Sequence, residues 1–432
     1  MCGVIGIYDK EGRDISKILY YGMYALQHRG QESAGMAVNN NGFIDYFKDL
    51  GLVHEVFHKD VLDRLRGNIG IGHVRYPNAA ESSLINAQPL VVGYKKGALA
   101  LAHNGNLINS KALREKLEDD GVIFQTNSDT EIIANLIARF HHDDIEVSIK
   151  NALDTIKGSF ALVIMTTDRL IGVRDPFGIM PLSIGKLGED YILSSETCAF
   201  DTIGAEFVRD VEPGEMVIIN DKGIRSIHSS NKPSRKSCIF EYIYFARPDS
   251  KIDGISIYLA RKEAGKILAK ESPTDADIVI SAPDSGTVAA IGYAEASGIP
   301  YSEGLIKNKY IGRTFIEPTQ ELREQGVRIK LNPLKENVAG KRVVLVDDSI
   351  VRGTTMSKIV EMLKKAGAKE VHVRICSPEV LFPCHFGIDT PKKKYLIASQ
   401  KSVEEIREMI GADSLAYLSL EGLIKGAGGG NE

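Results

Sequence analysis

The spacing of apolar residues in the first half of the chain predicts short strands and amphipathic helices that alternate irregularly. Apolar runs flank Asn39–Gly42 and Thr167-Asp168, which predicts two β-hairpins with their turns at these positions. Apolar residues recur at helical spacing in 110–121 and 128–140, and Ser128 with Glu131 predicts a capping box at the second helix start. Paired hairpins and paired helices favour antiparallel sheets layered with helices, an α+β arrangement.

In the second half the pattern becomes a repeated strand, loop and helix. Apolar strands in 277–286 and 342–348 end in small or acidic residues, and helical patterns follow at 288–298 and 356–368. This order predicts a parallel α/β sheet with its ligand at the carboxyl ends of the strands. A polar, basic stretch at 229–237 is typical of a linker. We therefore expect a first domain over 2–230, a linker over 231–250 and a second domain over 251–432.

Composition narrows the class of protein. The 432 residues carry a net charge of −4, with 43% hydrophobic and 25% charged residues, so we expect neither a nucleic-acid partner nor a membrane partner. Five cysteines without a C-x-x-C pair argue against a disulfide framework. The early charges at Asp9-Lys10-Glu11 leave no room for a signal-peptide apolar region. We expect a cytoplasmic protein.

The stretch VVLVDDSIVRGTT (343–355) has the features of a phosphate-binding loop. Its apolar strand delivers Asp347 and Asp348 to a strand end, and Thr354-Thr355 open the next helix. Backbone N–H groups at a helix start bind phosphate, and paired carboxylates suit ribose hydroxyls or hydrated Mg²⁺. The spacing of a Walker A loop is absent.

A second basic segment, LIKNKYIGRTFI (305–316), interleaves cations with glycine and tyrosine. Lys307, Tyr310 and Arg313 suit a mobile loop that closes over a polyanion and excludes water.

Cys2 has two interpretations, a small core residue or a nucleophile. If Met1 is removed, the freed α-amine can accept the thiol proton, as in nucleophiles that use their own amine as base. The residues that would serve thiolate attack on a carboxamide fall in separate segments. They are Arg75 and Tyr76 with Asp129 for the substrate's carboxylate and ammonium, and Asn104 with Gly105 for the oxyanion.

The segments CGVIGI, HRGQESAG, GHVRY and LAHNGNL together resemble the glutamine amidotransferases with an N-terminal cysteine nucleophile. VVLVDDSIVRGTT similarly resembles the thirteen-residue signature of the type I phosphoribosyltransferases. The resemblance implies a four-layer αββα N-terminal-nucleophile hydrolase domain followed by a parallel-sheet phosphoribosyltransferase domain. It also implies that Asp347 and Asp348 bind the ribose hydroxyls, and that these two residues and Ser285 lie on the side of the site where Mg²⁺ binds. The residues that would surround the 5-phosphate are Ser349, Arg352, Gly353, Thr354 and Thr355.

Both halves in this order resemble the glutamine-dependent amidotransferases that act on phosphoribosyl pyrophosphate. The resemblance implies amination of that substrate to 5-phosphoribosylamine, the first step of purine synthesis, with ammonia from glutamine channelled between two sites. It further implies Mg²⁺, inhibition by purine nucleotides, and a homodimer or homotetramer.

Two other metal patterns are weaker. His54-Glu55-Val56-Phe57-His58 fits H-E-x-x-H, which would place both histidines on one helical face for zinc. A third ligand is needed, and the only suggestive acid, Glu81, falls in a segment without a helical pattern. Cys238 and Cys384 fall on two of the four ligand positions of an iron–sulfur cluster present in one branch of the resembled family. A cluster normally needs four thiolates, so we expect no intact 4Fe-4S cluster.

Two alternatives remain at this point. A glutaminase of the same class could feed a different acceptor, although the 343–355 loop argues against it. A non-catalytic sensor of phosphoribosyl pyrophosphate would not need Cys2, and no basic helix–turn–helix is visible.

Overall fold

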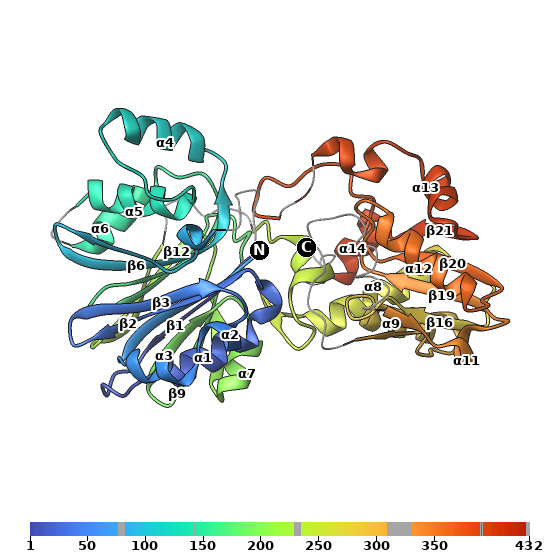
Figure 1. Cartoon of the computed structure of the whole chain (residues 1–432), viewed down its shortest axis with the longest axis horizontal. Coiled ribbons are helices and arrows are strands. Elements are labelled where there is room, and N and C mark those ends of the chain that lie inside the picture. Colours follow the sequence, from blue (N-terminus) through green and yellow to red (C-terminus); the bar gives the residue numbers. More distant parts are fainter. Residues whose placement is uncertain are drawn as a thin grey trace. The chain divides into compact units, whose positions relative to one another are not determined.

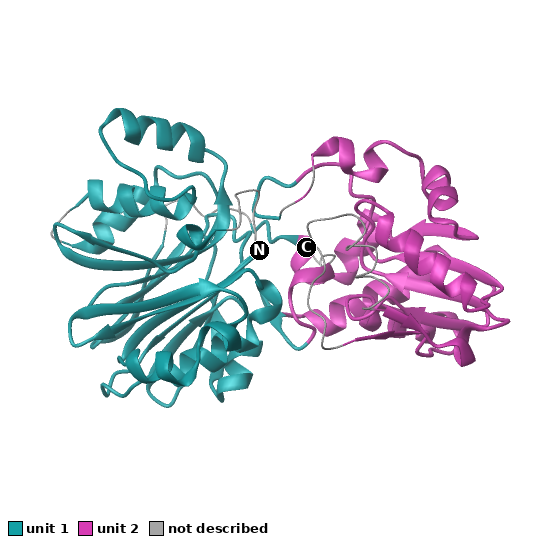
Figure 2. Ribbon diagram, viewed as in Figure 1, with its two compact units in different colours: residues 1–238, 249–254, 384–389 teal, residues 239–248, 255–383, 390–432 magenta. Residues whose placement is uncertain are grey.

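The computed structural model describes residues 1–76, 83–141, 144–228, 235–308, 331–388, 390 and 392–428, which form two compact units (Figure 2). Unit 1 comprises Met1–Cys238, Asp249–Gly254 and Cys384–Asp389, and unit 2 comprises Ile239–Pro248, Ile255–Pro383 and Thr390–Glu432. The stretch expected as a linker, 231–250, thus contributes 239–248 to unit 2. The domain limits at 230 and 251 stay a prediction.

Unit 1 contains two antiparallel sheets (Figure 1). In spatial order the first consists of β11 (Glu206–Asp210), β9 (Ser183–Leu187), β10 (Asp190–Ser194), β1 (Gly3–Tyr8), β4 (Ile69–Arg75), β2 (Ser33–Asn40) and β3 (Phe43–Leu50). The second consists of β13 (Gly223–His228), β12 (Glu215–Asn220), β8 (Leu170–Arg174), β7 (Gly158–Met165), β6 (Gly97–Leu107) and β5 (Leu90–Tyr94).

The two sheets face each other and helices cover their outer faces. The two sheets pack so closely that a Cβ atom added to Gly6 of β1 would lie 2.6 Å from the side chain of Val163 in β7. The first sheet is covered by α1 (Ser16–Ala25), α2 (Val53–Val56), α3 (Lys59–Arg64) and α7 (Cys198–Ile203). The second is covered by α4 (Ser110–Asp119), α5 (Asp129–Arg139) and α6 (Ile145–Leu153). The αββα layering expected for this half is confirmed.

Both expected hairpins are present, but the expected capping box is wrong. β2 and β3 turn at Asn41-Gly42, and β7 and β8 are joined across 166–169. The Ser128 side chain caps α5 by accepting the Thr130 N–H, whereas Glu131 turns to the preceding loop and accepts the N–H groups of Gln125 and Thr126. A buried carboxylate gains more from two loop donors than from one cap donor.

Unit 2 is built on a parallel sheet in the order β16 (Ile278–Ser281), β19 (Arg342–Asp347), β20 (Glu370–Ile375) and β21 (Ser414–Tyr417), as expected. Alternate strand residues point to opposite faces, and both faces are apolar, so each is covered by helices. One face packs against α12 (Thr354–Lys365) and α13 (Val403–Ile410). The other packs against α8 (Ile257–Glu271), α9 (Thr287–Ser297) and α14 (Leu420–Gly426).

The shorter elements complete the described chain. Unit 2 also contains the antiparallel pair β17 (Leu305–Lys307) and β18 (Leu331–Pro333), helix α11 (Lys335–Val338), the π-helix Glu241–Phe245, and single turns at Lys393–Tyr395 and Ile397–Ser399. Unit 1 adds single turns at Gln27–Arg29 and Leu84–Asn86 and strand β14 (Lys251–Ile252), while β15 (Ile255–Ser256) belongs to unit 2. None of the described helices has the length and apolar character that crossing a bilayer requires.

Candidate active sites

Cys2 lies directly before β1, the central strand of the first sheet in unit 1. Cys2 is 7% exposed, and its backbone nitrogen donates a hydrogen bond to Oδ1 of Asn104 at 2.9 Å. Its carbonyl oxygen accepts a hydrogen bond from Nε of Arg29 at 2.9 Å. The backbone on both sides of the thiol is therefore held by side chains from distant segments.

Asn104 and Gly105, the residues expected to form an oxyanion site, lie next to each other on β6. Nδ2 of Asn104 is buried and has no hydrogen-bond partner among the described residues, so it is available as a donor. β5 pairs only with 97–101, so Gly105 extends beyond that neighbouring strand. The φ of Gly105 is +151°, and a Cβ there would lie 2.1 Å from the Ser159 carbonyl oxygen, so only glycine fits.

Arg75 ends β4 and is brought to the same region because β4 pairs with β1. Its guanidinium forms a buried ion pair with Glu32, a partner that the sequence did not predict. The carbonyl oxygen of Tyr76 lies 3.9 Å from Sγ of Cys2. The other carboxylate oxygen of Glu32, Oε2, is buried and has no hydrogen-bond partner among the described residues. It can therefore still accept a hydrogen bond in this region near Cys2.

Asp129 is the first residue of α5, and its Oδ2 accepts the Leu107 N–H at 2.8 Å. Burial alone would raise the pKa of this carboxyl, but His103 and the Leu107 N–H more than offset that, so the pKa lies below its usual value. The carboxylate is ionised at neutral pH, as an ammonium-binding group must be.

Besides Glu32, the sequence interpretation missed two further residues of this site, Arg29 and Glu196. Arg29 is part of the quoted HRGQESAG segment, which was a usable signal, but no role was assigned to it. Glu196 follows β10 and carries no pattern around it. Its place beside Arg29 follows only from the pairing of β10 with β1.

The two metal patterns do not gather ligands in the structure. His54 lies in α2 while His58 precedes α3, so the two histidines do not share one helical face. Cys238 and Cys384 are partly exposed residues of unit 1. Over the described ranges no group of three or more His, Cys, Asp or Glu side chains could hold a metal ion.

In unit 2 the phosphate-binding loop connects β19 to α12 as expected. Asp347 ends the strand, and Gly353, with a φ of +79°, turns the chain into the helix. Thr354 and Thr355 are the first two helical residues and are exposed, and the first N–H groups of a helix have no partner within it and lie at the positive end of its dipole. This arrangement can receive a phosphate.

Asp347 and Asp348 form a tight acidic pair. The Asp348 N–H donates to Oδ1 of Asp347 at 2.9 Å, and the Ser349 hydroxyl donates to Oδ2 of Asp348 at 2.6 Å. Burial, followed by the Asp348 charge, raises the pKa of Asp347 well above its usual value. Such a pair is strained when fully ionised, so a cation or hydroxyl donors between the carboxylates would stabilise it.

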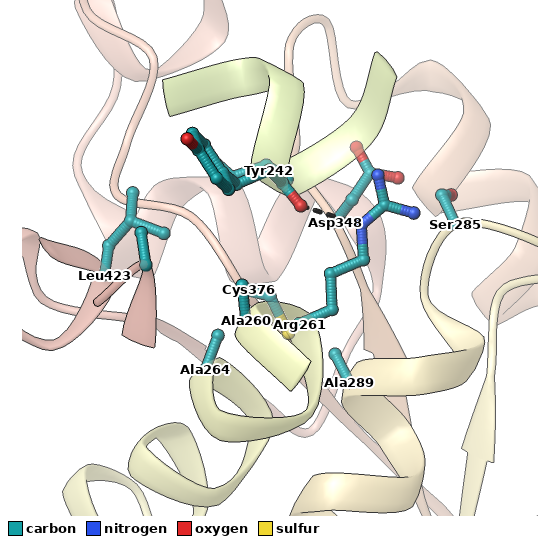
Figure 3. Close-up of a pocket in the computed structure, with 11 residues that line it drawn as sticks. Tyr242, Ala260, Arg261, Ala264, Ser285, Ala289, Asp348, Cys376 and Leu423 are labelled. Atoms are coloured by element: carbon teal, nitrogen blue, oxygen red, sulfur yellow. Dashed lines mark hydrogen bonds between the residues drawn. The ribbon is translucent and has the colours of Figure 1, made fainter. Parts of the chain in front are cut away.

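A small cavity of about 20 Å³ adjoins this pair, lined by Ser285 and Asp348 together with Arg261 and Cys376. Figure 3 shows the polar ends of Arg261, Asp348 and Ser285 toward one side and Leu423 toward the other. The volume suits one water-sized molecule. Ser285 and Asp348, two of the three residues expected on the Mg²⁺ side, line the same cavity.

The Asp347 carboxyl gives a stability prediction. A raised folded-state pKa means that ionisation destabilises the fold above the unfolded value of 3.8, and that this penalty disappears when both states carry the proton. Asp347→Asn removes the penalty, so in EDTA-containing buffer we expect Tm to rise by about 2–4 °C at pH 8 and the gain to shrink toward pH 5.

Asp277→Asn is the opposite control in this thermal-unfolding series. Arg342 lowers the pKa of Asp277 to about 2, so its ionised form stabilises the fold and its removal lowers Tm at neutral pH. Equal Tm for wild type and Asp347→Asn at every pH would contradict the prediction.

The basic segment is described only at its start. Lys307 ends β17 and forms an ion pair with Asp284 of the loop that contains Ser285. Tyr310 and Arg313 lie outside the described residues.

The residues present fit Mg²⁺ as a resident cation. Adjacent carboxylates and a serine hydroxyl supply hard oxygen ligands, and a cation would relieve the repulsion between the two carboxylates, which adds to burial in raising the pKa of Asp347. Asp347, Asp348 and Ser285 would hold the ion.

Comparisons with known proteins agree with this division of sites. A glutamine amidotransferase domain model matches residues 79–202, and a phosphoribosyl transferase domain model matches residues 256–377. Amidophosphoribosyltransferase of Bacillus subtilis (strain 168) is 54% identical over 428 residues, covering 99% of this chain and 90% of that protein. The enzyme of the same name from Archaeoglobus fulgidus is 53% identical, covering 98% and 93%.

A solved structure gives the same result. Glutamine phosphoribosylpyrophosphate amidotransferase from B. subtilis, in complex with ADP and GMP, is 54% identical with a TM-score of 0.93, covering 99% of this chain and 93% of that one. With identity and fold shared over nearly the whole length, this chain belongs to the amidophosphoribosyltransferase family.

Proposed function

We propose that the chain aminates phosphoribosyl pyrophosphate with ammonia from glutamine, using Cys2 as nucleophile in unit 1 and the Asp347–Asp348 pair in unit 2. The glutaminase reaction begins when the Cys2 thiol gives its proton to its own α-amine and the thiolate attacks the glutamine amide carbon. Nδ2 of Asn104 and the Gly105 N–H stabilise the oxyanion, ammonia leaves, and water hydrolyses the thioester to glutamate. The α-carboxylate and α-ammonium of glutamine are held by Arg75, Tyr76 and Asp129.

In the second reaction the residues of unit 2 orient the sugar phosphate. Asp347 and Asp348 bind the ribose hydroxyls. Ser349, Arg352 and Gly353–Thr355 surround the 5-phosphate, and Lys307 at the end of β17, beside the loop that contains Ser285, binds the pyrophosphate. Mg²⁺, when bound, neutralises charge on the departing pyrophosphate. Ammonia attacks C1 from the opposite face, giving 5-phosphoribosylamine with inversion.

The size and lining of the cavity bear on how ammonia is delivered. In free water at neutral pH most ammonia is protonated and cannot attack carbon, so we propose that it passes between the two reactions without release. The cavity beside Asp348 has walls of alanine and leucine over much of its surface, and its volume of about 20 Å³ suits a molecule the size of ammonia.

Further partners follow from the family and are proposals for this chain. The B. subtilis relative was solved with ADP and GMP, so we propose purine nucleotides as inhibitors here. A homodimer or homotetramer remains the expected assembly, and cytoplasm the expected compartment.

The single observation that carries the glutaminase proposal is the 2.9 Å contact between the Cys2 nitrogen and Oδ1 of Asn104. That nitrogen is an amide while Met1 is attached and becomes the base only after Met1 is removed. Intact-mass measurement of active protein should therefore show a chain that begins at Cys2. Met1 retained in molecules with full glutamine-dependent activity would overturn the proposed base.

A further inference from the structure

Glu196 is a buried carboxylate that has no role in the proposed reaction. It contacts Arg29, the residue whose side chain donates a hydrogen bond to the backbone of Cys2. It is 0% exposed and follows β10. Because β10 pairs antiparallel with β1, with Ser194 opposite Ile5, the end of β10 lies beside the start of β1, where Cys2 is.

The carboxylate is joined to Cys2 through one side chain. Oε1 of Glu196 accepts a hydrogen bond from Nη1 of Arg29, and Nε of the same guanidinium donates to the Cys2 carbonyl oxygen at 2.9 Å. Arg29 is 1% exposed, so it depends on Glu196 for its charge partner. A planar guanidinium fixed at one edge has few ways to orient its other edge.

The other contacts of Glu196 fix its own orientation. His28 lies with Nε2 2.8 Å from Oε1, and the Ser250 hydroxyl donates to Oε2 at 2.7 Å. Burial opposes ionisation, but His28 and Arg29 outweigh it, so the pKa of Glu196 lies well below its usual value. The carboxylate therefore acts as a fixed negative anchor.

Ser250 connects this anchor to another part of the chain. It belongs to 249–254, which is covalently continuous on both sides with segments of unit 2. The same short stretch is fixed in unit 1 by Arg174, whose guanidinium pairs with Asp253 at 2.8 Å, and by the Lys251 N–H on the Thr197 hydroxyl.

We propose that Glu196 is a positioning residue for the nucleophile: it holds Arg29, which holds the Cys2 carbonyl, and Ser250 sets the orientation of Glu196. The inference rests on the proposed role of Cys2. Thiolate attack depends on sub-ångström placement, and Glu196 touches neither substrate nor thiol, so its loss should lower turnover rather than glutamine binding.

The test compares Glu196→Gln with Glu215→Gln in the full chain. Glu215 is a matched control because it is also 0% exposed and paired with an arginine, Arg209, at 2.6 Å, and no described hydrogen bond joins either residue to Cys2. Both variants lose one buried charge, so both should lower Tm.

Four readouts are measured: glutamine-dependent kcat and KM, ammonia-dependent synthesis, and the rate of Cys2 alkylation by iodoacetamide, followed by peptide mass spectrometry. For Glu196→Gln we expect glutamine-dependent kcat and the alkylation rate to fall about 10- to 100-fold, with KM within about 3-fold. Ammonia-dependent synthesis should stay within about 2-fold, because it bypasses Cys2. Glu215→Gln should keep kcat within about 3-fold of wild type.

If Glu196→Gln does not fold, Ser250→Ala replaces it, since it removes one hydrogen bond only, and we expect about a 3- to 10-fold loss of glutamine-dependent kcat. Unchanged kcat and alkylation in a folded variant would overturn the inference, as would an equal loss in Glu215→Gln. If the proposed role of Cys2 were itself wrong, Cys2→Ala would retain glutamine-dependent activity. This result distinguishes failure of the proposed function from failure of the inference about Glu196.

Discussion

Replacing Cys2 by alanine is expected to reduce glutamine-dependent synthesis at least about a thousand-fold while leaving synthesis from added ammonium salt within about two-fold of wild type. The thiol supplies the bond that splits amide hydrolysis into two steps, and no other side chain at this position can form it. Unit 2 contains the entire phosphate-binding loop, so its reaction with free ammonia does not need the thiol. Pyrophosphate release with each nitrogen source, on one preparation, measures both reactions.

Cys238→Ala is the control for this variant. Cys238 is also a cysteine of unit 1, but it is partly exposed whereas Cys2 is buried, and no role in glutamine hydrolysis is assigned to it. It should keep both activities. If Cys2→Ala lost both activities, the assignment of the two reactions to separate units would be wrong, and if it lost neither, Cys2 would not be the nucleophile.

The second large effect is expected at the acidic pair of unit 2. Asp347→Ala should lower synthesis by about a hundred-fold or more with either nitrogen source, because the carboxyl group that we propose binds the ribose hydroxyls and Mg²⁺ is lost. Glutamine hydrolysis should continue at a measurable rate, since every residue assigned to that reaction belongs to unit 1. Glutamate and pyrophosphate are measured in parallel.

A matched control exists at the opposite end of the same sheet. Asp275 precedes β16, its side chain is 87% exposed, and it pairs with Arg342 at the start of β19. Asp275→Ala should therefore leave both products near the wild-type level. A normal pyrophosphate rate in Asp347→Ala would remove this residue from the site.

Together with the stability series, these variants separate two properties of Asp347. Its ionised carboxyl is costly to the fold because it is buried beside Asp348. Asp347→Asn is therefore expected to be more stable and Asp347→Ala inactive in synthesis, which is the usual relation between strained acidic groups and function.

The sequence by itself determined several of the helices and hairpins and the order of the two halves. Local periodicity is enough for this, since alternation and turn residues specify hairpins such as β2–β3, and apolar strands that end in acids specify β19 and its loop. The phosphate-binding loop was predictable because Asp347 to Thr355 are contiguous, so chain order alone brings them together.

Sequence reasoning also named Cys2, Asn104 and Asp129, but as separate segments. Cys2 and Asn104 are 102 positions apart, and only the packing of one sheet on the other brings the Cys2 nitrogen to the Asn104 amide. The expected capping box at Ser128 failed for a local reason, because the N–H groups of Gln125 and Thr126 in the loop before α5 donate to the Glu131 carboxylate.

The tertiary structure alone decided which charges stand behind the nucleophile. Arg29 and Glu196 are 167 positions apart, and their pairing depends on the register of β10 against β1, which no local pattern encodes. The same holds for Glu32 beside Arg75. Burial decides these contacts, because a charge removed from water must find its partner wherever the fold provides one.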